Sequence, residues 1–344
     1  MKKTVLILVV ALVYFVYNKL ETSGFFKEVN NYFDGTVTKI YTNMPGTEDI
    51  DVDRENGIMF ISSDGRWASR NGKTSETDGI YMFLPDSFEM PRLIPTTYEG
   101  EFHPHGISFF TQDSASYLFV VNHNSKGDFI ELFEYTGNQL LHLKSISDQM
   151  MCCPNDVVGV DKNRFYVTND HGNKTGYMRQ LEDYGGLAES YLLYYDDGNF
   201  SKAFENLQYA NGVNLSNDGS KLYLTHTTGG ELFIIDRNKA TGILGEYETI
   251  NLKTGVDNID VDELGNIWIG CHPQLLKFVG HSSSAENLSP SQVIKITPSQ
   301  KNKVDEVYVD DGAVLSGSST AVQYNGDLYI GVVFENKLLR GKLN

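Results

Sequence analysis

Short runs of alternating apolar and polar residues recur along most of the chain, separated by Asp, Asn and Gly. The clearest run, IDVDRENGIMFIS from Ile50, reads as two strands joined by a polar turn. Related runs start at Ile107, Val157, Val213, Ile259 and Ala321. Successive starts lie 57, 50, 56, 46 and 62 residues apart, a spacing typical of four-stranded blades rather than helical repeats. The pattern predicts an all-β protein, a six-bladed β-propeller.

The N-terminal segment has a different pattern. Val5–Tyr17 is an unbroken apolar run with two lysines before it and Lys19 after it. Its 13 residues fit a signal peptide and fall short of the ~20 that an ordinary membrane span needs. No small-x-small cleavage site follows, so a retained anchor stays open. We expect residues 1–20 to form a signal peptide or hydrophobic anchor helix and residues 21–344 the propeller. The protein is then secreted or membrane-associated.

The segment Asp170–Ser190 interrupts the repeat. Its large apolar side chains, which stand at roughly helical spacing, are Tyr177, Met178, Leu181, Tyr184 and Leu187. This spacing predicts a helix outside the blades. It would act as a lid over one tunnel mouth or form a plain surface insertion.

The net charge and the cysteines limit which partners and metals the chain is expected to bind. The formal net charge of −17 makes nucleic acid a poor partner and suits a protein that carries divalent cations. Cys152, Cys153 and Cys271 form neither a disulfide framework nor a zinc-binding CxxC motif. The N-x-[ST] sequons, which would make a secreted chain a glycoprotein, are at Asn173, Asn199, Asn214 and Asn287. The one at Asn214 falls in a predicted buried strand and is expected to be unused.

Polar residues precede the six repeats in one shared register. Two positions before each start are Glu48, His105, Asn155, Asn211, Asp257 and Ser319, and one position before are Asp49, Gly106, Asp156, Gly212, Asn258 and Thr320. The innermost strand of each blade lines the tunnel of a propeller, so equivalent positions converge on one axis. A single Asn or Asp before a strand is an ordinary turn residue. The shared register of all six blades is what favours a site.

Carboxylates and amides that converge in a tunnel are costly to bury without a counter-charge. Calcium takes roughly six to eight oxygen ligands of this kind, and the sequence has no Cys/His cluster to suggest zinc. The expected ligands of one calcium ion include Glu48, Asn155, Asn211 and Asp257. Because neighbouring strand residues point in opposite directions, Asp49 and Asp156 either hold a second, deeper ion or cap strand ends.

These residues lie in segments that resemble the serum paraoxonase/arylesterase family along nearly the whole chain. The segments are TEDI (Thr47–Ile50), HPHGIS (His103–Ser108), VVNH (Val120–His123), PNDVV (Pro154–Val158), TNDH (Thr168–His171), YANGVN (Tyr209–Asn214), VDNIDVD (Val256–Asp262) and GCHP (Gly270–Pro273). The family's members are calcium-dependent six-bladed propellers. The resemblance therefore implies a calcium-dependent hydrolase of lactones and aryl esters, with two bound Ca²⁺ ions.

The resemblance also implies residue roles. The ligands of the catalytic calcium would be Glu48, Asn155, Asn211, Asp257 and Asn258, and those of the structural calcium Asp49, Asp156 and the backbone carbonyl of Ile107. The two histidines proposed to handle protons correspond to His105 and His123. A retained N-terminal segment would help the protein to sit on a lipid particle or membrane surface.

The chain departs from the family in two places. Mammalian members carry a disulfide between the N-terminal part and the final strand, but no Cys precedes Glu48 here and none occurs in the tail LLRGKLN. We therefore expect the propeller to close by hydrogen bonds and packing alone. Cys271 matches the family's free cysteine. His103 replaces the usual Asn and would add an imidazole near the proposed site.

Two other functions and other proton carriers stay open. A gluconolactonase-like hydrolase of sugar lactones would have a polar pocket, and a calcium-stabilised binding propeller without catalysis would need no proton-handling histidines. The side chains that indicate an apolar pocket are Trp67, Phe102, Tyr177 and Tyr184. His171 and His272, near strand ends, are further candidates for proton transfer, and Glu48 could replace His105 as the base.

Overall fold

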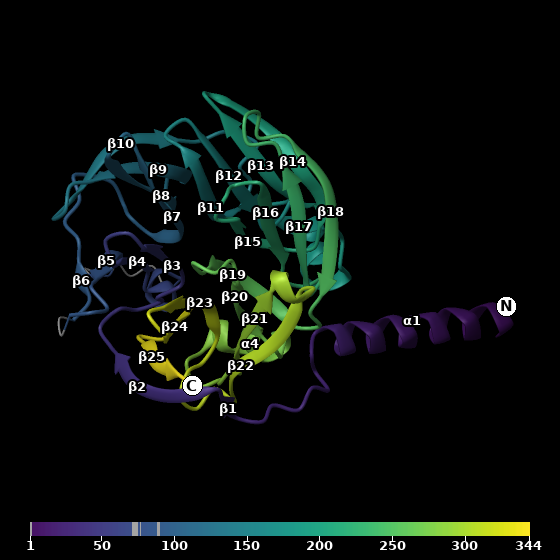
Figure 1. Cartoon of the computed structure of the whole chain (residues 1–344). Helices are drawn as coiled ribbons and strands as arrows, with labels where there is room; N and C mark the ends of the chain where they lie inside the picture. Colours follow the sequence, from purple (N-terminus) through teal and green to yellow (C-terminus); the bar gives the residue numbers. More distant parts are fainter. Residues whose placement is uncertain (1, 71–74, 76, 88–89) are drawn as a thin grey trace.

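The computed structural model describes residues 2–70, 75, 77–87 and 90–344. Its sheets are arranged around a central axis as the predicted six-bladed β-propeller (Figure 1). The innermost strands are β3 (Ile50–Asp53), β7 (Pro104–Gln112), β11 (Pro154–Asp161), β15 (Ala210–Leu215), β19 (Gly255–Val261) and β23 (Ser318–Tyr324). Each contains one of the six repeat starts, so the repeat boundaries are confirmed.

The remaining strands complete the blades by antiparallel pairing. The second strands are β4 (Ile58–Ser63), β8 (Ala115–Asn124), β12 (Arg164–Asn169), β16 (Lys221–His226), β20 (Ile267–His272) and β24 (Asp327–Val332). The third are β5 (Gly79–Phe83), β9 (Gly127–Tyr135), β13 (Ser190–Asp196), β17 (Glu231–Arg237), β21 (Ser291–Thr297) and β25 (Leu338–Leu343). The outer strands are β6 (Arg92–Leu93), β10 (Leu140–Ile146), β14 (Asn199–Leu207), β18 (Leu244–Asn251), β22 (Lys303–Asp310) with β1 (Tyr32–Phe33), and β2 (Gly35–Tyr41).

Helices lie outside the blades. They are α1 (Lys2–Thr22), α2 (Arg66–Ser69), α3 (Gly176–Gln180), the π-helix η1 (Leu181–Gly185), α4 (Leu275–Ser283) and the 3₁₀-helix η2 (Pro298–Gln300).

The blades pack face to face through side chains that alternate along each strand. On β8, Leu118 and Val120 pack in the cluster shared with the first blade, whereas Phe119 and Val121 pack in the cluster shared with the third. All four are fully buried. Because successive side chains point to opposite faces, a strand buried on both faces reads as the continuous apolar run YLFVV. The same double burial in each blade produces the repeat seen in the sequence.

The ring closes when β2, near the N-terminus, pairs with β25 at the C-terminus. The register runs from Gly35 opposite Leu343 to Tyr41 opposite Leu338. The three cysteines are free thiols. Closure by hydrogen bonds and packing, as the sequence predicted, therefore depends on this one strand pair and the side chains beneath it.

The N-terminal helix is longer than the apolar run that predicted it. Helix α1 spans 21 residues, about 30 Å at 1.5 Å per residue, and none of its side chains is buried. It projects from the rim of the propeller (Figure 1). By length and composition α1 is apolar enough to cross a membrane, although a signal sequence passes the same test. The helix extends beyond the apolar run Val5–Tyr17 at both ends, mostly through polar residues, so a signal peptide and a retained anchor both remain compatible with it.

The segment Asp170–Ser190 is helical, as its spacing predicted. It joins β12 to β13 and contains α3 and η1, which follow one another without a break. Gly186, in the left-handed region with φ +74°, ends η1 and turns the chain back toward β13.

The asparagines of all four sequons donate a hydrogen bond from Nδ2, Asn199 and Asn287 to the backbone carbonyls of Asp196 and Gly280. Asn214 lies in β15, and its Nδ2 donates to the carbonyl of Ile259 at 2.8 Å. Nδ2 of Asn173 donates to Glu182 Oε1 at 2.6 Å. The position of Asn214 inside a blade is the one that the sequence predicted.

A substitution in the closing strand tests how much β2 contributes. Tyr41 is 2% exposed and packs edge-on against Phe83, with ring centroids 5.1 Å apart. Tyr41→Ala should lower the free energy of unfolding by about 3 kcal/mol or more, because it removes a buried aromatic ring. Ile40, the preceding residue of β2, is 38% exposed, so Ile40→Ala should cost less than about 1 kcal/mol. Urea unfolding measures both, and equal midpoints for the two variants would contradict this role of β2.

Candidate active site

Near the polar residues that precede the repeats, here called the polar ring, the inner strands break their regular pairing with the second strands. Pairing with the second strand shifts register between Pro104 and Ile107, Pro154 and Val157, Ala210 and Val213, Val256 and Ile259, and Ser318 and Thr320. Residues freed from a ladder in this way can redirect their side chains. Two successive residues, such as Asp257 and Asn258, can therefore both serve the axis, which strict alternation along a strand would forbid.

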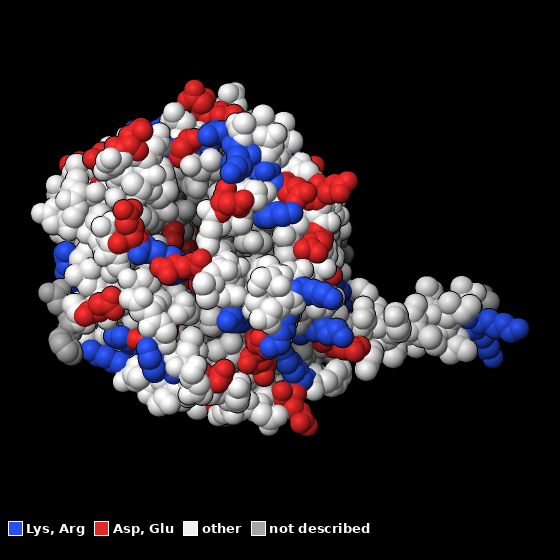
Figure 2. Space-filling model, viewed as in Figure 1, with Lys and Arg blue, Asp and Glu red and all other residues white. Residues whose placement is uncertain are grey.

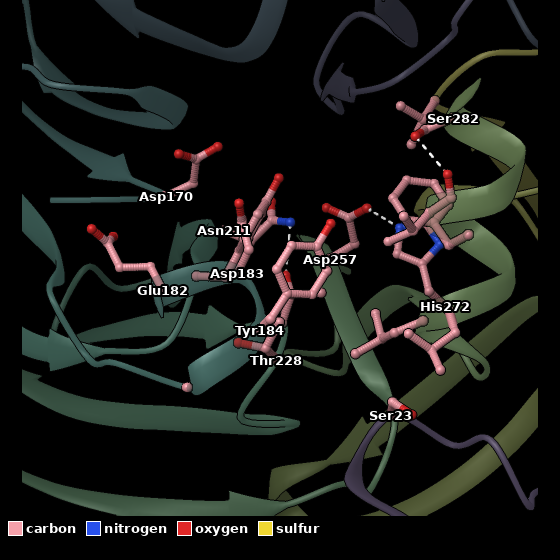
Figure 3. A pocket seen from close by; sticks show the side chains of 18 of the residues that line it. Ser23, Asp170, Glu182, Asp183, Tyr184, Asn211, Thr228, Asp257, His272 and Ser282 are labelled. Carbon is pink, nitrogen blue, oxygen red and sulfur yellow. Dashed lines mark hydrogen bonds and ion pairs between the residues drawn. The ribbon is translucent and has the colours of Figure 1, made fainter. Parts of the chain in front are cut away.

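Five of the six residues two positions before the repeats line one cavity of about 730 Å³. They are Glu48, His105, Asn155, Asn211 and Asp257. The sixth, Ser319, instead donates from Oγ to the backbone carbonyl of Glu48 at 2.6 Å. Asn258 donates from Nδ2 to Glu48 Oε1 at 2.9 Å. The propeller face is hollowed near its middle (Figure 2), and Asn211 and Asp257 are seen from close by in Figure 3.

Buried oxygen atoms that have no hydrogen-bond donor among the described residues lie at the cavity wall and directly behind it. Four belong to lining residues, Glu48 Oε2, Asn155 Oδ1, Asn211 Oδ1 and Asp257 Oδ1, and the fifth is Oδ1 of Asn258, whose Nδ2 donates to Glu48. Buried polar atoms are rarely left unsatisfied, since each costs roughly 1–3 kcal/mol. These atoms come from carboxylates and amides, the groups that ligate calcium. The five residues that the family resemblance implies for one ion therefore have the chemistry to hold it.

Charge at the axis is poorly balanced in the protein alone. Burial opposes ionisation of Glu48, but His105 and Arg66 outweigh it and lower the pKa of Glu48 to about 2. Burial raises the pKa of Asp257, despite the opposing effect of His272. For Asp49 and its neighbour Asp156, burial followed by nearby negative charge raises the pKa well above the usual range. A bound cation would relieve this repulsion.

Asp49, Asp156 and Ile107 line a second cavity of about 10 Å³, separate from the large one. This is about the size of one water molecule. Both oxygens of each carboxylate accept a backbone N–H; for example, Ile107 donates to Asp49 Oδ2 at 2.8 Å and Val213 to Asp156 Oδ2 at 2.7 Å. The carboxylates are held by these backbone groups, and among the described residues no cationic side chain forms an ion pair with them, which suits either a second small cation or strand capping.

Glycine occupies a ring position where the next blade comes close. A Cβ on Gly106 would lie 2.5 Å from both Cα and Oδ1 of Asp156. Any side chain there would push β11 away from the axis. Gly106 is therefore in the ring because it allows this close approach, and not because it supplies a ligand.

The two predicted catalytic histidines are in contact. His105 Nδ1 is 3.0 Å from His123 Nε2, and His105 Nε2 is 3.4 Å from Glu48 Oε1. His105 lines the cavity, and His123 stands behind it on β8. Burial lowers the pKa of His123, so its ring is neutral at pH 7. The pair can therefore accept a proton on the cavity side and share it through the inner nitrogen.

The two further histidine candidates are both buried. His272 Nε2 is 2.8 Å from Asp257 Oδ2 (Figure 3), and its ring stacks on Phe278 with centroids 3.7 Å apart. His171 lies between Asp170 and Asp183, at 2.5 Å and 2.8 Å. His272 therefore orients an expected calcium ligand, whereas His171 fastens η1 to the end of β12.

One wall of the cavity is apolar, but mostly not through the side chains that the sequence suggested. Its large apolar residues are Phe15, Val16 and Leu20 of α1, Leu275, Leu276, Phe278 and Val279 of α4, and Phe334. Of the four predicted aromatics only Tyr184 lines the cavity. Trp67 stacks behind on Phe334, Phe102 packs against Phe133, and Tyr177 is 72% exposed. The run LLKFVG after GCHP was the missed signal, because its apolar spacing is helical.

Two charged residues also differ from expectation. Arg66, which the sequence did not single out, lines the cavity with Nη2 3.9 Å from Glu48 Oε2. His103 does not line the cavity. Its Nδ1 is 3.0 Å from Asp64 Oδ1 and 3.8 Å from Asp78 Oδ2. His103 thus belongs to an acidic cluster with Asp64 and Asp78 rather than to the cavity lining.

Solved structures share the fold at low sequence identity. The gluconolactonase XC5397 from Xanthomonas campestris aligns with a TM-score of 0.58 and 14% identity over 92% of this chain and 96% of that one. The calcium-binding protein regucalcin from Agrobacterium tumefaciens gives 0.54 and 13% over 91% and 95%. At such identities the likeness shows the fold alone.

Sequence comparison identifies the family. The family model described as Arylesterase matches residues 34–341. Human serum paraoxonase/arylesterase 1 is 35% identical over 305 residues, 85% of each chain, and serum paraoxonase/arylesterase 2 of Gallus gallus is 34% identical over 304 residues, again 85% of each. The match covers the propeller, including every residue of the polar ring. The chain therefore belongs to the arylesterase family.

Proposed function

We propose that this protein is a calcium-dependent hydrolase of lactones and aryl esters. The observation that carries the proposal is a group of five buried oxygen atoms without donors among the described residues, four at the wall of the large cavity on Glu48, Asn155, Asn211 and Asp257 and one beside it on Asn258. Two of these five residues are carboxylates, whose charge matches one divalent ion. Membership of the arylesterase family and the adjoining histidine pair support the same activity.

Bound calcium would supply a Lewis acid that polarises the substrate carbonyl and stabilises the negative charge that develops on its oxygen. The protein's own residues do the rest. His105 Nε2, on the cavity side, would take the proton from the attacking water, and His123 would hold the imidazole in place. Arg66, near Glu48, adds positive charge at the same wall.

The smaller cavity between Asp49, Asp156 and Ile107 is the proposed place of a second, structural calcium ion. Asp49 accepts from the backbone of Ile107 in the next blade, and Asp156 accepts from Val213 in the blade after its own. An ion that bound both carboxylates would join the first and third blades at the axis, and the backbone carbonyl of Ile107 would add the second. Its role would therefore be to stabilise the ring rather than to contact substrate.

The walls of the large cavity favour apolar substrates. The α4 side chains and Phe334 form one side, and Phe15 and Val16 of α1 reach the mouth. A sugar lactone, rich in hydroxyl groups, would leave this surface without partners. A gluconolactonase-like activity is therefore the weaker alternative, and a binding propeller without catalysis would not need the His105–His123 pair.

Helix α1 is proposed to attach the protein to a lipid particle or membrane. Its apolar side chains from Val5 to Tyr17 are exposed, and Figure 2 shows the helix as an uncharged rod with basic side chains at its tip. The end of α1 is joined to the cavity rim, where Leu275 N donates to Ser23 O at 2.9 Å. A lipid surface that held α1 would thus lie close to the cavity mouth.

Replacement of one ligand tests the calcium site. Asp257→Asn removes a charge but keeps the size of the side chain. Mutation of a residue that only hydrogen-bonds to a metal ligand typically lowers metal affinity or activity by about 10–100-fold. Loss of a charged ligand itself should therefore weaken calcium binding and lactone turnover by about 100-fold or more. Asp236→Asn, on the exposed surface of β17, is the matched control and should change neither. Calorimetric calcium titration and lactone hydrolysis measure both effects. Normal calcium affinity in Asp257→Asn would rule out this site.

Two N-terminal deletions separate anchoring from catalysis. Removal of residues 1–11 shortens the apolar rod but keeps Phe15 and Val16 at the cavity, whereas removal of residues 1–17 takes them away. Both should reduce sedimentation with phosphatidylcholine vesicles, since each loses exposed apolar surface. Only the longer deletion should raise KM for an apolar lactone. Unchanged vesicle binding in both variants would contradict the anchor.

A further inference from the structure

The histidine pair is part of a longer chain of hydrogen bonds. His123 Nδ1 is 2.7 Å from Asp128 Oδ1. Asp128 lies on β9 directly opposite His123 on β8, as cross-strand partners in the hairpin. The hairpin register therefore fixes the contact, and it does not depend on a mobile loop. Three side chains, His105, His123 and Asp128, are thus linked in sequence, beginning with His105 at the cavity.

Asp128 is held as a carboxylate. Its side chain is only 12% exposed, and its second oxygen accepts from Lys174 Nζ at 2.6 Å. Burial opposes ionisation, but the hydrogen bonds from His123 and Lys174 lower the pKa of Asp128 below its usual value. At neutral pH the group is ionised and can only accept hydrogen bonds.

An acceptor at Asp128 determines the tautomers of both rings. Because Oδ1 can only accept, the hydrogen of neutral His123 must be on Nδ1, which leaves Nε2 of His123 as an acceptor. His105 must then carry its hydrogen on Nδ1 and donate it to His123 Nε2. Nε2 of His105 is left with a free lone pair on the cavity side. Glu48 Oε1, 3.4 Å away, already accepts from Asn258.

We propose that Asp128 is the positioning residue of a His105–His123–Asp128 triad, which fixes the tautomers so that His105 presents an unprotonated Nε2 to the cavity. Its effect on turnover rests on the proposed hydrolase function. In Ser-His-Asp triads a carboxylate orients the catalytic imidazole directly. Here a second imidazole, that of His123, lies between the carboxylate and the catalytic ring. Asp128 does not line the cavity, and its side chain bonds to His123 and Lys174, so it acts on His105 through His123.

The triad can carry a proton without net loss. As water attacks the ester carbonyl, its proton moves to His105 Nε2 and the Nδ1 proton of His105 moves to His123 Nε2. His123 is then an imidazolium whose Nδ1–H remains bonded to the Asp128 carboxylate. When the C–O bond to the leaving alkoxide breaks, His105 Nε2 gives its proton to that oxygen and His123 returns one to His105 Nδ1. The enzyme ends in its starting state.

Lys174 has a lesser role than Asp128. Its side chain is 63% exposed, so solvent screens its ion pair with Asp128. It comes from the helical insertion between β12 and β13, whereas Asp128 is built into a blade. Lys174→Met should therefore change turnover by less than about threefold. This small effect separates a positioning carboxylate from a general loss of polar contacts.

Asp128→Asn is the decisive variant, because the amide is isosteric but can donate to His123 Nδ1 and so reverse both tautomers. We expect kcat for a lactone to fall by roughly 100-fold or more, with KM within about threefold, since general-base catalysis contributes a factor of this size. Asp113→Asn, an exposed position in the β7–β8 turn of the same blade, is the matched control and should leave both constants unchanged. Asp128→Glu keeps the carboxylate and should recover part of the rate.

Nitrogen-15 NMR of the histidine rings gives a readout that does not require activity. The wild type should show His123 protonated on Nδ1 and not on Nε2, and Asp128→Asn should lose this state. An unchanged His123 tautomer, or an unchanged kcat in Asp128→Asn, would overturn the triad. If Asp128→Asn gives no soluble protein, Asp128→Glu is compared by the same two measurements, and a wild-type Nε2–H tautomer at His123 overturns the triad directly.

The two proposals fail in different ways. A wild-type protein that hydrolyses no lactone but shows the expected tautomers would remove the hydrolase function and leave the assignment of Asp128 in place. If the wild type hydrolyses lactones and Asp128→Asn does so equally fast, the triad is ruled out and the hydrolase function stands.

Discussion

The structure depends on carboxylates buried together at the axis of a ring. Glu48, Asp49, Asp156 and Asp257 are each at most 5% exposed. Among the described residues, the guanidinium of Arg66 near Glu48 is the one permanently charged cation beside them, and the imidazoles of His105 and His272 also adjoin the group. Buried negative charges of this density are stable only with a counter-charge. A calcium centre is the simplest arrangement that satisfies them, and it would couple the stability of the ring to the chemistry of the cavity.

The blades make this arrangement possible by keeping their inner strands rigid. Side chains on β8 interlock with the blades on both sides, and the β2–β25 pair closes the circle. Backbone N–H groups of neighbouring blades then hold Asp49 and Asp156 in place. The same rigidity extends to the β8–β9 hairpin, whose register sets Asp128 against His123. Packing far from the cavity therefore determines the orientation of the groups that face it.

Much of this could be predicted from the sequence. The repeat located each inner strand, because strands that are buried on both faces appear in the sequence as continuous apolar runs at regular spacing. The shared register found five cavity residues but not Asn258, since alternation along a strand predicts that it points away from Asp257. The register shift between Val256 and Ile259 removes that restriction, and it leaves no residue pattern of its own.

The cavity walls were harder to predict, because they come from α1 and α4 rather than from the blades. Trp67, Phe102 and Tyr177 have the right chemistry but face elsewhere, and which way a side chain points depends on loops that no periodicity describes. Asp128 was missed for a different reason. An Asp after a hairpin turn is common, and only its place opposite His123 gives it a role.

The central claim is that calcium and this cavity together hydrolyse apolar lactones. The most direct measurement is hydrolysis of a medium-chain aliphatic δ-lactone before and after removal of calcium by a chelator, followed by addition of excess calcium. The account predicts that turnover disappears with the chelator and returns with calcium. Turnover that survives complete removal of calcium would contradict it.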